Sequence, residues 1–265
     1  MTEFVGTTSP MSQHGLDQAL GILSVGQPEL WTVLSVETSG FGFLPDRRPL
    51  ILFERHIFHQ QTAGIFDAAS PGISSPIPGG YLGGSQEYTR LAAAMALNAH
   101  AALNSASWGI GQVMGFNSRL AGFDTVEAMV AAMVQSEDAQ LAGMASFVRA
   151  KGLHKPLAQH DWAGFARGYN GEDFAKNQYD AKLASFFQKF ATGPLPDIRV
   201  RQAQALLTFL GMEPNGVDGI SGKGTQSAIV RFRQQNGMGN SGEIDDALIA
   251  AMSAKMGAAS SSAST

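Results

Sequence analysis

A short proline- and glycine-containing segment divides this chain of 265 residues into two parts. The segment Thr192-Gly-Pro-Leu-Pro196 separates two regions with helical patterns. Proline cannot continue a helix and glycine is costly to order, so this composition predicts a connection between folded units. We therefore predict a large domain over residues 1–192, a linker over 193–196, a small domain over 197–257 and a disordered tail rich in alanine and serine over 258–265.

The pattern of the first part predicts a mostly α-helical fold with a small β region. Apolar residues at helical spacing and runs of alanine and leucine predict helices over 12–26, 85–103, 125–151, 162–169 and 179–190. Residues 49–58 are β-branched and aromatic, which fits either a strand or the start of a buried helix. The second part alternates helical patterns with an Asp-Gly turn and a glycine-rich turn, which predicts a three-helix bundle.

Composition excludes several classes of function. The net charge is −4 on residues 1–196 and 0 on residues 197–265, so neither part has the basic field that binds nucleic acid or an anionic membrane. The chain has no cysteine, which excludes disulfides, thiolate zinc sites and a cysteine nucleophile. No signal peptide and no apolar stretch of about 20 residues is visible, so we expect synthesis in the cytosol and no stable membrane association. The pair His56-x-x-His59 lacks the glutamate of helical zinc motifs, and we expect no metal and no cofactor.

Glu37 is the main candidate for a catalytic residue. It ends a mostly apolar run that starts at Trp31, and the glycine-containing stretch 38–43 follows it. Apolar surroundings disfavour the charged form of a carboxyl group, so Glu37 can keep its proton near neutral pH and donate it, as cleavage of a glycosidic bond requires. The alternative is a glutamate that ends a helix and points into water, and this alternative is favoured for Glu37 taken alone.

Three short segments, taken together and in order, change this interpretation. They are Glu37-Thr-Ser-Gly40, Ser107-Trp-Gly-Ile-Gly-Gln112 and Ala166-Arg-Gly-Tyr-Asn-Gly171. Their order resembles the signature of lysozyme-like muramidases, the goose-type lysozymes and lytic transglycosylases. Thr38 stands where that signature has serine, and Ile110 stands where it has leucine.

A closer resemblance covers nearly all of residues 15–190. The matching segments are Glu37–Leu44, Arg48–Phe58, Ala106–Asn117 and Asp161–Gly171, and they are similar to the N-acetylmuramidase domain of modular phage endolysins. The resemblance implies a lysozyme-like α+β fold and cleavage of the β-1,4 bond between N-acetylmuramic acid and N-acetylglucosamine in bacterial peptidoglycan. It also implies residence in the host bacterial cytoplasm during infection and action in the periplasm once the inner membrane is permeabilised.

The resemblance places the general acid at Glu37 and implies that nearby side chains bind the sugar. The predicted substrate-binding residues are Thr38, Trp108, Gln112, Tyr169 and Asn170. The ring of Trp108 is suited to stack on a pyranose, although a buried indole is an equal alternative. Gln112 offers donors and acceptors for a sugar amide or a carboxylate. Tyr169 and Asn170 can bond to the N-acetyl group or to Glu37, or can serve as a core phenol and a helix cap.

The second carboxylate of the reaction is less well defined. Glu54 lies between apolar residues and is predicted to act as base, nucleophile or stabiliser; the alternative is an ion pair with a neighbouring arginine or with His56. Asp46, in a Pro-Asp-Arg turn, is the second choice. A separation of about 5 Å between the Glu37 and Glu54 carboxyls would predict retention of configuration, and about 6.5–9.5 Å would predict inversion.

The small C-terminal domain resembles the three-helix peptidoglycan-binding domain of cell-wall hydrolases. The matching segments are Val200–Leu207, Val217–Thr225 and Ala228–Phe232; Arg233 stands where the family commonly has glutamine, and Met238 where leucine is usual. The predicted wall-binding residues are Gln204, Asp218, Gly219 and Thr225. Since an Asp-Gly turn and a threonine N-cap also explain part of this motif, it can be largely structural.

The sequence therefore predicts a monomeric two-domain hydrolase whose partner is peptidoglycan. Three alternatives stay open: a lytic transglycosylase at the same bond, an amidase or peptidase acting on the stem peptide, and a non-catalytic wall-binding protein. A linked binding domain would raise the effective concentration of the enzyme at an insoluble substrate.

Overall fold

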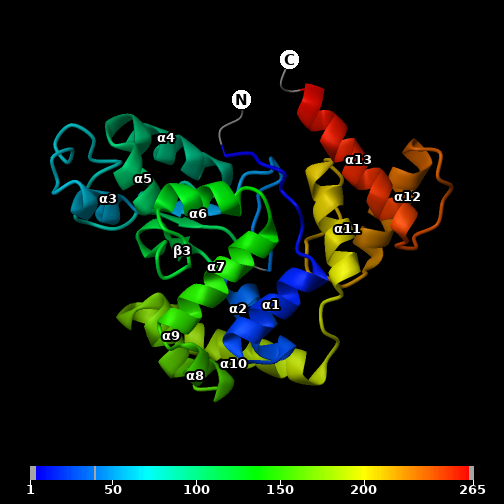
Figure 1. Ribbon diagram of the computed structural model, residues 1–265, viewed down its shortest axis with the longest axis horizontal. Helices are drawn as coiled ribbons and strands as arrows, with labels where there is room; N and C mark the ends of the chain where they lie inside the picture. The colour runs from blue at the N-terminus through cyan, green and yellow to red at the C-terminus, as the bar shows by residue number, and fades with distance from the viewer. Residues whose placement is uncertain (1–3, 39, 263–265) are drawn as a thin grey trace.

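The computed structural model describes residues 4–38 and 40–262, and Figure 1 shows a large helical domain beside a smaller bundle. The large domain contains helices α1 (Gln13–Leu23), α2 (Gln27–Thr38), α3 (Arg55–Gln61), α4 (Glu87–Leu97), α5 (Ala99–Asn104), α6 (Val126–Met133), α7 (Glu137–Ala150), α8 (His154–Ala158), α9 (Trp162–Asn170) and α10 (Tyr179–Thr192). Its strands are β1 (Ile51–Phe53), β2 (Ala106–Trp108) and β3 (Val113–Met114). The bundle contains α11 (Ile198–Phe209), α12 (Lys223–Gln235) and α13 (Asp246–Ser262). The predicted fold class, mostly helical with a small sheet and a C-terminal bundle, is confirmed.

Capping side chains divide two helices that the sequence predicts as single. Asn98 is extended (φ −159°, ψ 103°) and its side chain accepts from the Ala101 N–H, so the predicted helix 85–103 breaks into α4 and α5. Ser136 does the same for α7 by accepting from the Ala139 N–H, so the predicted helix 125–151 also becomes two. Both residues satisfy the free N–H groups of a new first turn, which a periodic apolar pattern does not reveal.

Residues 49–58 form both of the elements that the sequence left open. Strand β1 comes first, and α3 begins two residues after it. The sheet has the order β1-β2-β3 with antiparallel pairing, in which Ile51 lies opposite Trp108 and Ser107 lies opposite Met114. The turn between β2 and β3 starts at Gly109, whose φ of +69° favours glycine.

The core of the large domain forms where α1 packs on α7 and α2 packs on α10. Leu30, Trp31 and Leu34 of α2 are almost completely buried there. Because this helix is anchored by its apolar residues, the position of its C-terminal end, where Glu37 lies, is well fixed. Within the described residues, none of the helices combines the length and the hydrophobicity needed to span a bilayer.

The bundle packs directly against the large domain. The ring of Phe209 lies 5.7 Å from that of Phe41 and 6.0 Å from that of Phe43, centroid to centroid. Gln202 Nε2 also donates to the Met11 carbonyl at 3.1 Å. The small domain is therefore joined to the large one by an apolar contact as well as by the linker.

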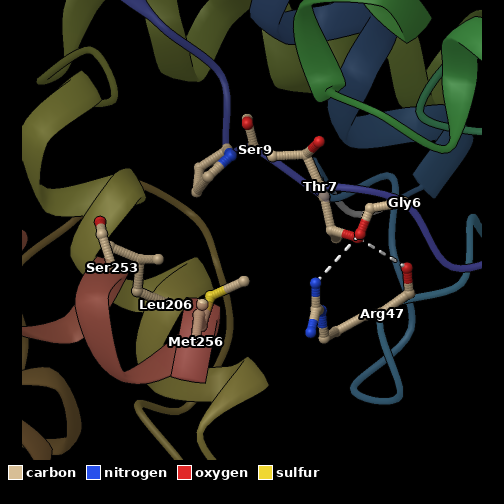
Figure 2. A pocket seen from close by; sticks show the side chains of 10 residues that line it. Gly6, Thr7, Ser9, Arg47, Leu206, Ser253 and Met256 are labelled. Atoms are coloured by element: carbon tan, nitrogen blue, oxygen red, sulfur yellow. Dashed lines mark hydrogen bonds between the residues drawn. The ribbon is translucent and has the colours of Figure 1, made fainter. Parts of the chain in front are cut away.

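A cavity of about 460 Å³ lies at this junction, between the N-terminal segment 6–10 and helices α11 and α13 (Figure 2). The Arg47 guanidinium donates to the Gly6 carbonyl at its edge, at 3.0 Å. Leu206 and Met256 line its other side. Its lining residues carry no carboxyl group, so this cavity is not a candidate for acid catalysis.

The last helix extends further than the sequence predicts. Residues 258–262 continue α13 and are helical, which corrects the prediction of a disordered tail over 258–265 for the part that the structure describes. Met256 is buried in the bundle and anchors the preceding turn. From an anchored turn, each added alanine or serine needs to fix only its own backbone, so the helix continues at low cost.

Candidate active site

Glu37 lies in the last turn of α2 and is partly buried. Asn170 Nδ2, at the end of α9, donates to its Oε1 at 3.2 Å. Burial raises the pKa of Glu37 from 4.5 to about 7, and the hydrogen bond from Asn170 opposes this rise in part. A carboxyl group in these surroundings is protonated for much of the time at neutral pH, whereas its local sequence alone favoured a glutamate that points into water.

Two tyrosines lie close to this carboxyl group. Burial, and then the negative charge of Glu37, raise the pKa values of Tyr169 and Tyr179 above the ordinary tyrosine value. The Tyr169 hydroxyl donates to the Gly111 carbonyl at 2.5 Å, which joins α9 to the turn between β2 and β3. The sequence indicated Tyr169, but it carried no signal for Tyr179, because a residue at the start of α10 comes near Glu37 only through the packing of α10 on α2.

Thr38 and Gln112 use their polar atoms within the protein. Thr38 Oγ1 donates to the Ile110 carbonyl at 3.0 Å. Gln112 Nε2 donates to the carbonyls of Leu50 and Gly109, and its Oε1 accepts from Ser107 Oγ at 2.8 Å. Both side chains fix the turn between β2 and β3 beside Glu37, and their predicted contact with substrate stays a prediction.

Trp108 cannot stack on a sugar, so that prediction is wrong. Its side chain is 0% exposed, and its Nε1 donates to the Leu103 carbonyl at 3.1 Å. The reason lies in β2, which is buried on both faces, so that the alternation of a half-exposed strand does not apply. The indole is therefore part of the hydrophobic core, which was the other interpretation of this residue.

Glu54 lies at the far end of the sheet from the turn beside Glu37. Its Oε2 accepts from the Tyr81 hydroxyl at 2.8 Å and lies 3.1 Å from His56 Nδ1. Burial, and then this hydrogen bond, raise the pKa of Tyr81 to about 12. The Leu50 carbonyl accepts from the Gly109 N–H at the start of the turn, and Glu54 follows four residues later along β1, which is about 13 Å of extended chain. This arrangement favours a local role for Glu54 over a direct pairing with Glu37.

We therefore expect Glu54→Gln to lower the rate of peptidoglycan solubilisation by less than about tenfold, because a glutamine still accepts from Tyr81 and Glu37, the candidate acid, is untouched. The initial rate on purified sacculi measures this, with Glu37→Gln assayed in parallel. Equal losses in the two variants would restore Glu54 as a catalytic carboxylate. Asp46, the second choice, is held by Arg48 in its turn, with Nη2 at 2.5 Å.

The four predicted wall-binding residues form one internal network. Gln204 Nε2 donates to Asp218 Oδ1 at 2.9 Å and to Thr225 Oγ1 at 3.0 Å, while its Oε1 accepts from the Gly219 N–H at 2.8 Å. Gln204 and Thr225 are almost completely buried. Thr225 lies inside α12, whose N-cap is Gly222, so its predicted capping role is wrong. The network fixes the Asp-Gly turn, and a role in binding the wall stays a prediction.

His59 and His160, which lie outside this region, each pair with a carboxylate. His59 Nδ1 lies 2.7 Å from Asp67 Oδ2, and His160 Nε2 lies 2.7 Å from Glu29 Oε1. Among the side chains that the structure describes, histidine, aspartate and glutamate do not gather in any group of three that could hold a metal ion.

Two protein families match the chain. N-acetylmuramidase matches residues 26–191, and a putative peptidoglycan binding domain matches residues 197–252. Among solved structures, the chain is similar to the crystal structure of the Burkholderia AP3 phage endolysin, with 40% sequence identity, a TM-score of 0.63, and coverage of 68% of this chain and 70% of that chain. The comparison with curated proteins finds no match.

The helical fold with a partly buried glutamate at the end of α2, together with these matches, defines a lysozyme-type glycoside hydrolase. The chain belongs to the N-acetylmuramidase family. Its muramidase domain is followed by a domain of the peptidoglycan-binding type.

Proposed function

We propose that this protein is a phage endolysin that hydrolyses the β-1,4 bond between N-acetylmuramic acid and N-acetylglucosamine, with Glu37 as general acid. The observation that carries the proposal is the Glu37 carboxyl, whose pKa burial raises to about 7 in a domain of the muramidase family. Family membership supports the bond, and the raised pKa supports the residue. Peptidoglycan is the proposed partner of both domains.

The proposed reaction starts with transfer of the Glu37 proton to the glycosidic oxygen. The bond between that oxygen and C1 of N-acetylmuramic acid breaks with its electron pair on oxygen, and positive charge develops on the sugar. A water oxygen then bonds to C1 and loses a proton to a base. Asn170 holds the Glu37 carboxyl in place through its donated hydrogen bond. No cofactor is needed, because proton transfer and electrostatic stabilisation supply the chemistry.

Mass spectrometry of the fragments released from purified sacculi tests the bond. We expect muropeptides that end in a reducing N-acetylmuramic acid. An anhydro end would instead establish the lytic transglycosylase alternative, in which the sugar's own hydroxyl replaces water. A free lactyl group, with intact glycan strands, would establish an amidase and overturn the proposal.

The proposed acid predicts how the rate depends on pH. Because only protonated Glu37 donates, we expect the rate to fall about tenfold per pH unit above about 7. Tyr169 and Tyr179, which lie near it, keep their protons in this range because their pKa values are raised. Asn170→Ala removes a bond that lowers the Glu37 pKa, so it should move this limb to higher pH. Initial rates from about pH 3.5 to about pH 9 measure both effects, and a limb near the ordinary glutamate value of 4.5 would contradict the assignment.

The place of action follows from the same proposal. An enzyme of this kind would accumulate in the host bacterial cytoplasm and reach the periplasm after the inner membrane is permeabilised. Likeness to a phage endolysin supports this route. Infected cells in which the inner membrane is kept intact should therefore contain the active enzyme and not lyse.

A further inference from the structure

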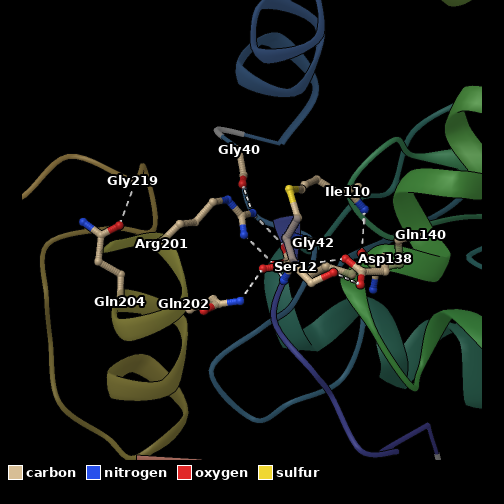
Figure 3. Close-up of polar contacts among 12 residues, drawn as sticks. Ser12, Gly40, Gly42, Ile110, Asp138, Gln140, Arg201, Gln202, Gln204 and Gly219 are labelled. Carbon is tan, nitrogen blue, oxygen red and sulfur yellow. Dashed lines mark hydrogen bonds and ion pairs between the residues drawn. The ribbon is translucent and has the colours of Figure 1, made fainter. Parts of the chain in front are cut away.

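A buried ion pair connects the two domains (Figure 3). Arg201, on α11 of the bundle, has a side chain that is 1% exposed, and its partner Glu137, on α7 of the muramidase domain, has one that is 0% exposed. Arg201 Nη1 donates to Glu137 Oε2 at 2.5 Å, and Nη2 donates to Oε1 at 2.8 Å. This two-bond geometry fixes the orientation of both groups as well as their separation.

The same guanidinium holds the backbone that follows the candidate acid. Arg201 Nη2 also donates to the Gly40 carbonyl. The Gly40 N–H in turn donates to the Leu34 carbonyl at 3.0 Å, at the C-terminal end of the helix that carries Glu37. Gly40 adopts φ of +84°, which glycine tolerates best. Arg201 is therefore only two hydrogen bonds away from α2.

Glu137 holds the next part of the same loop. Its Oε1 accepts from the Gly42 N–H at 3.1 Å, and its Oε2 accepts from the Met11 N–H at 3.0 Å. A Cβ atom at Gly42 would lie 1.9 Å from Gln140 Oε1, so the loop lies directly against α7 and has no room for a side chain there. The carboxylate is thus shared between the loop after Glu37 and the bundle.

Cation–π contacts reinforce this attachment. The Arg201 guanidinium lies 5.9 Å from the ring of Trp31, on α2, and 5.8 Å from the ring of Phe41. A cavity of about 530 Å³ follows this contact, with Thr38 on one wall and residues 211–217 of the bundle on the other. The bundle therefore forms one wall of the cavity beside Thr38, the residue that follows Glu37.

We propose that Arg201 is a positioning residue of the muramidase site: through Gly40 and Glu137 it fixes the loop that follows Glu37, so the C-terminal domain takes part in catalysis as well as in anchoring. This inference rests on the proposed role of Glu37. Anchoring alone needs only a linker of suitable length. A guanidinium that is removed from water is stable only when its hydrogen bonds and its ion pair have good geometry. Because Arg201 makes these bonds to the loop and to Glu137, the position of the loop depends on how the bundle packs against the large domain.

The test compares full-length Arg201→Met and Arg201→Lys with Arg199→Met. Arg199 is on the same helix and pairs within the bundle with Asp246 at 2.7 Å, so it is a matched control. The readings are the rate at saturating sacculi, the sacculus concentration at half-saturation, and the alkaline limb of the pH profile. Sacculus binding is measured separately by co-sedimentation.

For Arg201→Met we expect a saturated rate lower by between about 10-fold and about 100-fold, because small displacements of catalytic groups are costly. The half-saturating concentration should change by less than about twofold, as the binding domain is intact. The alkaline limb should move to lower pH, since a loosened loop admits water to Glu37. The saturated rate of Arg201→Lys should lie between those of Arg201→Met and wild type, because one ammonium group cannot make both hydrogen bonds of the guanidinium to Glu137 in the same geometry. Arg199→Met should match wild type.

If Arg201→Met kept the wild-type saturated rate and the wild-type alkaline limb, the proposal would be overturned. A change in the half-saturating sacculus concentration alone would also overturn it, because it would indicate a role in anchoring only. If Arg201→Met fails to fold, Arg201→Lys decides by the same readings, because it keeps a positive charge beside Glu137. Activity retained by Glu37→Gln would instead refute the proposed acid. An inactive Glu37→Gln beside fully active Arg201 variants would refute only the positioning role.

Discussion

Replacing Glu37 with glutamine is expected to lower the rate of sacculus solubilisation by between about 10²-fold and about 10⁴-fold, the range typical of a lost general acid. The glutamine oxygen still accepts from Asn170, so the geometry of the site is kept while the acidic proton is lost. The measurement is the initial rate at a pH of about 6, where wild-type Glu37 is mostly protonated.

The fold of this variant is expected to be as stable as wild type or more stable at high pH. The Glu37 pKa is raised on folding from 4.5 to about 7, so its contribution to stability is complete below pH 4.5 and is lost as pH rises through about 7. Glutamine has no such loss, so thermal unfolding near pH 8 should favour the variant. The control is Glu29→Gln, on the same helix, which removes only an ion pair with His160 and should keep the rate within about twofold. A Glu37→Gln enzyme as fast as this control would end the proposal.

Replacing Glu137 with alanine is expected to cost about 3–5 kcal/mol of unfolding free energy, because it leaves the guanidinium of Arg201 buried without its counter-ion. The N–H groups of Met11 and Gly42 lose their acceptor in the same change. For a chain of this size, this loss of free energy corresponds to a thermal unfolding midpoint that is lower by roughly 10 °C. Urea unfolding followed by circular dichroism measures the free energy.

Glu127→Ala provides the contrast for this prediction. Glu127 pairs with His100 at 2.7 Å, but both side chains are more than half exposed, so its loss should cost no more than about 1 kcal/mol. If the two alanine variants were equally stable, the ion pair between the domains would not hold them together as we infer.

Some helices and site residues could be predicted from the sequence, and others could not. The Pro-Gly segment and the patterns of α9 and α10 are local signals, and they predicted these two helices and the break after Thr192. The apolar run before Glu37 gave a physical reason for the raised pKa of its carboxyl. The choice of Glu37 as general acid came from the three motifs together, and it stays a prediction. Asn98 and Ser136 show the limit for helices, since one capping hydrogen bond overrides a continuous pattern. Trp108 shows the limit for predicting site residues. The motif indicates which residue type is present, but only its burial shows that the indole belongs to the core and cannot contact substrate.

Long-range pairings carried no local signal. Arg201 and Glu137 are 64 residues apart and lie on opposite sides of a domain boundary, and nothing in either neighbourhood indicates the other. The same holds for Tyr179, which comes near Glu37 through helix packing. Such pairs depend on how the two domains and the helices pack, and packing is a property of the whole chain.

The shared guanidinium has a consequence for exchanging modules between enzymes of this type. A chimera that replaced the bundle with an unrelated targeting module would take Arg201 away and leave the Glu137 carboxylate without its counter-ion. Retargeting at the linker alone should therefore give a poorly active, unstable product. A graft that retains α11, with Arg201 and Phe209, would keep the contacts that the recipient requires.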